Sequence, residues 1–281
     1  MVLPPDSHVH TQWSWDAARG SMEHSCARAV ELGLPAIAFT EHVDHTVWTV
    51  DREAIAGNEH LLSFTSPDGR VTPTTFDAHG YLEDVERCRG LFPDLRILSG
   101  LELGEPHLHH EAVAKVLAAG PFDRVLGSLH CLPDADGFTE PGELFGRRAT
   151  AEVLREYLAD VARMVATDET FSVLAHVDYP VRSWPEGEVG PFDPKNFEAE
   201  IRHALGATAA AGKALEINTV VPLHATILRW WHDVGGDAVT FGSDAHDPTA
   251  VARRFREAAH MAEAHGFRPG RDPHGLWTRV D

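Results

Sequence analysis

A short strand followed by a helix recurs seven times along this chain of 281 residues, and this repeat limits the possible folds more than any other feature. Most of the strands are nearly continuous apolar runs, as expected for strands that are buried on both faces of a parallel sheet. The predicted strands cover residues 6–10, 35–40, 96–101, 124–129, 172–175, 214–218 and 238–243. The alternation favours an α/β fold, a closed or nearly closed parallel (β/α) barrel.

The segments between the strands carry helix signals. Ser21 is a suitable N-cap and Gly33 a suitable stop for a first helix over residues 21–33. Further helices are predicted over residues 77–91, 108–119, 150–166, 195–211, 224–234 and 249–265. Residues 46–75 are predicted to be an inserted loop, either a lid or a simple insertion, with a short helix over 51–62. Residues 267–281 read as a C-terminal tail, and no linker divides the chain, so we expect one domain over residues 1–281.

Charge and composition exclude several classes of protein. The formal charge of −19 disfavours a broad surface for nucleic acid or anionic lipid. No apolar run approaches the roughly 20 residues of a membrane span, and the first residues do not resemble a signal peptide. Three scattered cysteines, Cys26, Cys88 and Cys131, suit free thiols in a reducing compartment. We therefore expect a cytoplasmic protein without a nucleic-acid or membrane partner, and the number of subunits stays open.

Residues that can bind metal ions stand at the ends of the predicted strands. In parallel barrels the loops at the carboxyl ends of the strands converge and form the active site. Six of the seven strands end there in a His, Asp or Glu residue, which chance alone does not readily explain. The candidate ligands are His8, His10, Asp16, His42, Glu102, His130, His176, Asp244 and His246.

The first strand shows how one strand end can supply several ligands. Alternate side chains of a strand share a face, so Asp6, His8 and His10 point the same way. Two imidazoles with the carboxylate of Asp16 in the next turn form a typical half of a divalent-metal site. Asp6 could accept a hydrogen bond from one of these imidazoles and orient it.

Nine ligands are too many for one four-coordinate zinc and suit two or three cations that share a bridging carboxylate. Three divalent cations carry six positive charges against the carboxylates of Asp16, Glu102 and Asp244, which leaves about +3 in the pocket. Such a local field attracts a phosphate group even though the whole chain is acidic.

Seven sequence motifs, taken together and in order, make the chain resemble the PHP (polymerase and histidinol phosphatase) family of metal-dependent phosphoesterases, most of all its histidinol-phosphatase branch. The motifs begin at Asp6, Thr40, Gly100, Gly127, Ala175, Leu215 and Gly242, and read DSHVH, TEH, GLE, GSLH, AHVD, LEINT and GSDAH.

The resemblance implies a distorted (β/α)7 TIM-like barrel with a trinuclear centre. It implies that one metal is held by His8, His10, Glu102 and Asp244, a second by Glu102, His130 and His176, and a third by Asp16, His42 and His246. Glu102 would bridge the first two. Zinc, manganese and iron all fit this sulfur-free set.

The expected reaction is hydrolysis of a small phosphate monoester, most readily histidinol phosphate in histidine biosynthesis. We expect a hydroxide that bridges the metals beside Glu102, with Asp244 and His246 close by, to attack the phosphorus atom in line. Arg182 could bind the phosphate in a bidentate manner. Asp178, which follows the strand over 172–175, and Asn218, the last residue of the strand over 214–218, are further substrate-binding candidates.

One departure keeps other substrates open. After the LEINT motif, histidinol phosphatases tend to continue with small residues and a basic pair, whereas here Val220–His224 is followed by no Arg or Lys until Arg229. The alternatives are another small phosphomonoester, a nucleotide or an oligonucleotide 3′ end. A non-catalytic metal-binding module is a further alternative, which the complete ligand set argues against.

Overall fold

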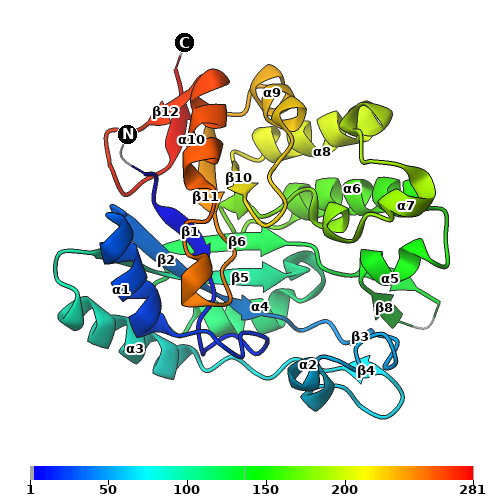
Figure 1. Cartoon of the computed structure of the whole chain (residues 1–281), viewed down its shortest axis with the longest axis horizontal. Coiled ribbons are helices and arrows are strands. Elements are labelled where there is room, and N and C mark those ends of the chain that lie inside the picture. Colours follow the sequence, from blue (N-terminus) through cyan, green and yellow to red (C-terminus); the bar gives the residue numbers. More distant parts are fainter. Residues whose placement is uncertain (1–2, 136, 281) are drawn as a thin grey trace.

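One curled sheet organises the structure, a computed structural model that describes residues 3–135 and 137–280 (Figure 1). Within those residues the sheet has nine strands in the order β1-β2-β5-β6-β9-β10-β11-β13-β12. Its first seven strands are all parallel. They are β1 (Asp6–Val9), β2 (Ala36–Val43), β5 (Arg96–Gly104), β6 (Arg124–Ser128), β9 (Val173–Leu174), β10 (Ala214–Asn218) and β11 (Ala238–Gly242).

The two outer strands of this parallel set meet just beyond β11. The backbone N–H of Asp244 donates to the carbonyl of His8 at 2.8 Å, and that of His10 donates to the carbonyl of Ala245 at 2.9 Å. Val9 and Ala245 form a parallel bridge. These contacts close the curl between the first and seventh parallel strands, so the predicted (β/α)7 barrel is confirmed.

Along the chain, the helices connect successive strands, and they lie close to their predicted positions. Ser21 accepts the N–H of His24 through its side chain, and Gly33 ends the helix with φ of 69° and its N–H bonded to two preceding carbonyls, as the cap signals indicated. The main helices are α1 (Met22–Leu32), α3 (Ala78–Leu91), α4 (His110–Leu117), α6 (Thr150–Thr167), α8 (Glu198–Ala210), α9 (Ala225–Asp233) and α10 (Phe255–Ala264). The last of these begins later than predicted, after a short 3₁₀ turn at Pro248–Ala250.

The core consists of apolar side chains between the sheet and the helices. In the larger cluster α6, α8, α9 and α10 pack on β9, β10 and β11, and Trp230, Trp231 and Tyr157 are its largest fully buried residues. A second cluster joins α1 and α3 to β2 through residues such as Met22 and Phe39. This packing holds the strands rigidly, and with them the side chains at their ends.

The inserted segment 46–75 differs from its predicted form. It contains the short antiparallel pair β3 (Trp48–Thr49) and β4 (Arg70–Val71) and only one turn of helix, α2 (Glu59–Ser63). The predicted helix over 51–62 is wrong because Asn58 caps the helix, with its side chain accepting the N–H of Leu61. Trp48 packs edge-on against Trp15 at 5.6 Å between ring centroids, and this contact anchors the insertion to the barrel.

Three further segments add structure that was not predicted. Residues 267–281 were expected to be a tail, but β12 (Phe267–Pro269) and β13 (Trp277–Arg279) form a hairpin that extends the sheet beyond β11. The buried Trp277 ring meets Phe241 of β11 at 4.8 Å, which explains why the hairpin docks there. After β6 a second hairpin, β7 (Leu132–Asp134) and β8 (Gly137–Thr139), leads into the short helix α5 (Pro141–Phe145). The four-residue α7 (Glu186–Val189) precedes α8.

Within the described part of the chain, none of the helices has both the length and the apolar character needed to span a lipid bilayer.

Tyr81 gives a direct test of how α3 supports the sheet. Its buried hydroxyl donates to the carbonyl of Phe39 at 2.6 Å and accepts the N–H of Gly100 at 2.8 Å, so it links β2 and β5. Tyr81→Phe leaves both backbone groups without this partner, and we expect the free energy of unfolding to fall by about 1–3 kcal/mol. Denaturant or thermal unfolding measures the change. An unchanged midpoint would contradict the structural role of this hydroxyl.

Candidate metal centre

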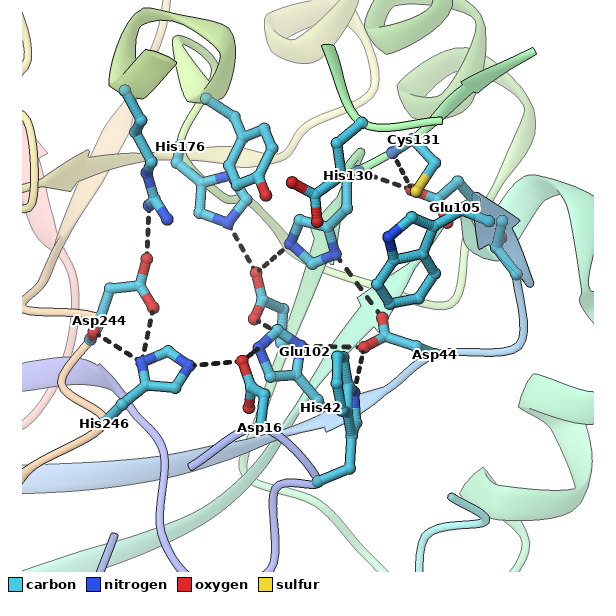
Figure 2. Close-up of a pocket in the computed structure, with 16 residues that line it drawn as sticks. Asp16, His42, Asp44, Glu102, Glu105, His130, Cys131, His176, Asp244 and His246 are labelled. Carbon is cyan, nitrogen blue, oxygen red and sulfur yellow. Dashed lines mark hydrogen bonds and ion pairs between the residues drawn. The ribbon is translucent and has the colours of Figure 1, made fainter. Parts of the chain in front are cut away.

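All nine predicted ligands converge where the parallel strands end. His8, His42 and Glu102 lie within β1, β2 and β5, and the other six lie in the segments that follow strands. Seven of the nine line one pocket (Figure 2), namely Asp16, His42, Glu102, His130, His176, Asp244 and His246. His8 and His10, 0% and 1% exposed, are buried next to it.

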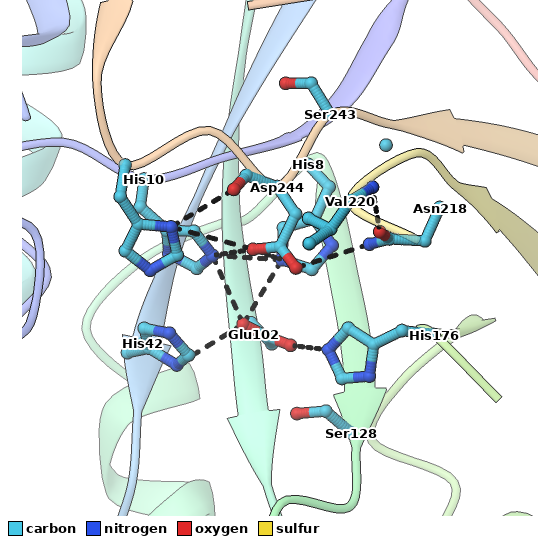
Figure 3. Close-up of polar contacts among 12 residues, drawn as sticks. His8, His10, His42, Glu102, Ser128, His176, Asn218, Val220, Ser243 and Asp244 are labelled. Atoms are coloured by element: carbon cyan, nitrogen blue, oxygen red, sulfur yellow. Dashed lines mark hydrogen bonds and ion pairs between the residues drawn. The ribbon is translucent and has the colours of Figure 1, made fainter. Parts of the chain in front are cut away.

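Four ligand atoms face one another at the end of β1 (Figure 3). His8 Nε2 and His10 Nε2 are 3.0 Å apart, and Glu102 Oε2 lies 3.2 and 3.3 Å from them. Asp244 Oδ1 is 3.6 Å from His8 Nε2 and 3.2 Å from His10 Nε2. This is the first ligand set that the family resemblance implied.

The other two expected sets are also assembled. Glu102 Oε1 lies 2.7 Å from His176 Nε2 and 3.3 Å from His130 Nε2. Asp16 Oδ2 lies 2.9 Å from His246 Nε2 and 3.4 Å from His42 Nε2 (Figure 2). His42 Nδ1 is 3.3 Å from Glu102 Oε2, which connects this set to the other two.

The electrostatics of the cluster keep its carboxylates ionised. Burial alone raises the pKa of Glu102, but the imidazoles of His8, His42 and His130 outweigh burial and hold the pKa well below its usual range. Asp16 and Asp244 behave in the same way, each with imidazoles among the groups that lower its pKa. Ionised carboxylates are the form that binds a cation.

The donor set fits divalent metal ions. Glu102 Oε2 and Asp16 Oδ1 are buried without a hydrogen-bond partner among residues 3–135 and 137–280, and such orphaned acceptors are rare in native folds. In four sets of three residues the ligand atoms lie within 4.8 Å of one another: His8/His10/Asp244, His8/Glu102/His176, His10/His42/His246 and His42/Asp44/His130. Clustered nitrogen and oxygen donors of this kind suit zinc, manganese or iron.

Buried side chains behind the ligands hold the imidazoles in place. Glu216 Oε1 lies 2.7 Å from His8 Nδ1, so His8 can donate to this carboxylate while Nε2 faces the cluster. Ser14 Oγ lies 3.0 Å from His10 Nδ1 and donates to Glu41 at 2.6 Å. Burial lowers the pKa of His8, but Glu216 and the two ligand carboxylates outweigh this and raise it well above its usual value.

Sequence reasoning missed two carboxylates that contact the ligand imidazoles, Asp44 and Glu216. Asp44 lies 3.3 Å from His42 Nδ1 and 3.6 Å from His130 Nδ1, and its spacing of two residues from His42 is the signal that could have identified it. Glu216 stands inside a motif that was recognised, but no role was given to it. The role expected for Asp6 was wrong: Asp6 accepts the backbone N–H groups of Ser243 and Ala252 rather than an imidazole.

The three predicted substrate-binding residues lie in different positions relative to the pocket. Arg182 lines the pocket, donates to Asp244 Oδ2 at 2.5 Å and lies over the Tyr179 ring at 4.9 Å. Asn218 does not line it but donates to Asp244 Oδ2 at 3.3 Å from behind (Figure 3). Asp178 is also absent from the pocket lining. It borders a separate apolar cavity because the chain turns into a 3₁₀ helix directly after it, and burial raises its pKa to about 6.

Nine further residues line the pocket beside the seven predicted ligands. The empty space of the pocket, about 550 Å³, includes open solvent at its mouth. The remaining lining residues are Trp15, Asp44, Thr46, Trp48, Glu105, Cys131, Glu140, Tyr179 and Arg182.

Comparison with known proteins gives consistent matches. The model of the PHP domain family matches residues 6–220. The histidinol-phosphatase of Lactococcus lactis is 27% identical over 270 residues, covering 92% of this chain and 88% of the relative. A probable histidinol-phosphatase of Thermotoga maritima is 31% identical over 272 residues, covering 93% and 92%. The crystal structure of the Lactococcus lactis histidinol phosphate phosphatase, complexed with zinc, L-histidinol and phosphate, aligns with a TM-score of 0.76 at 24% identity, covering 95% of each chain.

Proposed function

This chain belongs to the PHP family, and from that membership we propose that it is a histidinol-phosphatase, a metal-dependent hydrolase of a small phosphate monoester. The observation that carries the proposal is the position of Glu102. This one buried carboxylate lies within 3.3 Å of five imidazoles from four different strand ends, those of His8, His10, His42, His130 and His176. Such a convergence suits a cluster of cations that shares a bridging carboxylate.

Two or three divalent ions would be held by the chain's own ligand sets. In this proposal the sets are His8, His10, Glu102 and Asp244; Glu102, His130 and His176; and Asp16, His42 and His246. When bound, cations of this kind lower the pKa of coordinated water and neutralise charge that develops on the phosphoryl oxygens. Glu216 contributes by accepting the Nδ1 proton of His8, which leaves Nε2 free as a ligand.

Arg182 would bind the phosphate in this proposal. Within the described residues its guanidinium group donates a hydrogen bond to Asp244 alone, so other N–H groups remain for phosphate oxygens. Arg182→Lys keeps the charge but removes the planar fork, and we expect the KM for the phosphate ester to rise about tenfold. Steady-state kinetics with metal-loaded enzyme checks this. An unchanged KM would show that Arg182 does not bind the substrate.

A panel of phosphorylated metabolites tests the proposed function. The enzyme, loaded with zinc, manganese or iron, would be assayed on histidinol phosphate, other small phosphomonoesters, bis-phosphorylated nucleotides and DNA 3′ ends. We expect a kcat/KM for histidinol phosphate at least about tenfold above that for the others. Preference for nucleotides or DNA ends would overturn the proposal, although the charge of −19 and the names of the relatives do not favour that alternative.

The proposal includes a cytoplasmic location, where thiols stay reduced. It is supported by Cys26, Cys88 and Cys131, which are free and buried in the fold.

A further inference from the structure

One carboxyl group in the pocket makes no hydrogen bond or ion pair with the residues that the structure describes. Six such groups line the pocket: Asp16, Asp44, Glu102, Glu105, Glu140 and Asp244. The proposed metal centre uses three of them. Asp44 contacts the imidazole of His42 and accepts the indole N–H of Trp15 at 2.8 Å, and Glu105 accepts the backbone N–H groups of His130 and Cys131. Glu140 makes no side-chain hydrogen bond or ion pair within the part of the chain that the structure describes.

The position of Glu140 turns its side chain toward the pocket. Glu140 directly follows β8 and precedes Pro141, the first residue of α5, where a carboxylate often caps the helix. It does not cap α5; instead it lines the pocket together with Cys131 and Tyr179. The side chain is partly buried, and burial is the largest cause that raises its pKa to about 7, with Glu143 and Glu105 adding to the effect against the opposing influence of His130.

The surroundings of Glu140 suit a cation. Trp15, Trp48 and Tyr179 line the same pocket, and the faces of aromatic rings attract an ammonium group. A partly buried carboxyl near other carboxyls gains from a partner that brings positive charge. The phosphate end of a substrate brings negative charge, so a positively charged partner within the substrate would belong to the alcohol half of the ester.

We propose that Glu140 is a specificity-determining residue that binds the ammonium group of a substrate whose leaving alcohol carries a protonated amine. This inference rests on the proposed function, because it takes the phosphate to lie at the metal centre. Histidinol phosphate belongs to this class, with an amine on the carbon next to the one that carries the phosphate ester. The inference adds the residue that selects such substrates against neutral and anionic phosphate esters.

A cycle of two enzymes and two substrates tests the inference. Wild type and Glu140→Gln, loaded with the same metal, would be assayed on histidinol phosphate and on N-acetylhistidinol phosphate, which has the same ester but no ammonium. We expect N-acetylation to lower kcat/KM about 10- to 100-fold for wild type and less than about threefold for the variant. Equal losses with both esters in the variant would overturn the inference, because they would indicate a general acid or a structural role.

Glu143→Gln is the matched control. Glu143 lies one helical turn further along α5 and borders a different surface depression with Thr49 and Arg147. The control should keep the full preference for the amine, and both variants should keep the metal content and melting temperature of wild type. Loss of the preference in both variants would overturn the assignment to Glu140.

Failure of the proposed function would be recognised separately. If wild type does not hydrolyse histidinol phosphate but hydrolyses other esters, the same cycle is run with phosphoethanolamine and ethyl phosphate. A preference of wild type for the amine that disappears in Glu140→Gln supports the inference for another amino-alcohol ester. The absence of such a preference overturns it.

Discussion

Glu102→Gln is expected to lower kcat/KM by about 1,000-fold or more and to reduce the metal content of the purified protein. Both carboxylate oxygens of Glu102 face imidazole nitrogens, Oε1 towards His130 and His176 and Oε2 towards His8, His10 and His42. A glutamine replaces one of these oxygens by an NH₂ group, which cannot bind a cation and meets the ring nitrogens with its own hydrogens. Both neighbouring ligand sets would lose their shared anion.

Metal analysis and steady-state kinetics on the same preparations check this result. Glu143→Gln is a suitable control because Glu143 does not line the pocket and makes no ion pair within the described residues. Circular dichroism would establish that both variants are folded. A Glu102→Gln enzyme with full activity and full metal loading would refute the bridging role.

Glu216→Gln is expected to weaken metal affinity about 10- to 100-fold although Glu216 is not one of the proposed ligands. Its carboxylate accepts three N–H groups, from His8 Nδ1 at 2.7 Å, from the backbone of His176 at 2.8 Å and from Asn218 Nδ2 at 3.2 Å. Burial raises its pKa, but the charge of His8 outweighs burial and keeps the group ionised. A glutamine has only one acceptor oxygen, so its NH₂ group must face a donor and displace His8 or His176.

Competition with a chelator measures the metal affinity of this variant. Because the ligands themselves remain, excess metal should restore most of the activity, in contrast to Glu102→Gln. Gly242 indicates how tightly the site is packed, since a Cβ atom there would lie 1.8 Å from Glu216 Oε1. An unchanged affinity in Glu216→Gln would mean that His8 keeps its orientation without this carboxylate.

Much of the fold and of the ligand set could be predicted from local sequence. The strand boundaries of β10 and the helix caps Ser21 and Gly33 follow from residue preferences that act over a few residues. Parallel barrel strands all end at the same face, so a His or Glu that ends a buried strand is placed there by the strand itself. His42 and Glu102 are cross-strand neighbours in β2 and β5, which is why reasoning about strand ends brought them together.

The predictions that failed depended on where a segment docks. The tail became a hairpin on β11 because Trp277 finds a buried site against Phe241, which no local pattern specifies. Asp178 follows His176 closely, yet the 3₁₀ turn that begins at Tyr179 leaves it beside apolar side chains.

By itself, the sequence determined the order of strands and helices and the residues that end each strand, because both depend on spacing along the chain. Only the tertiary structure decided which atoms meet. His8 and Glu216 are separated by 208 residues and come within 2.7 Å. Among residues 3–135 and 137–280, Glu140 is left without a side-chain hydrogen bond or ion pair, in a pocket formed by several strand ends. The physical reason is that a contact between distant residues depends on how the whole barrel closes, whereas the preference for a strand or a helix cap acts over only a few neighbouring residues.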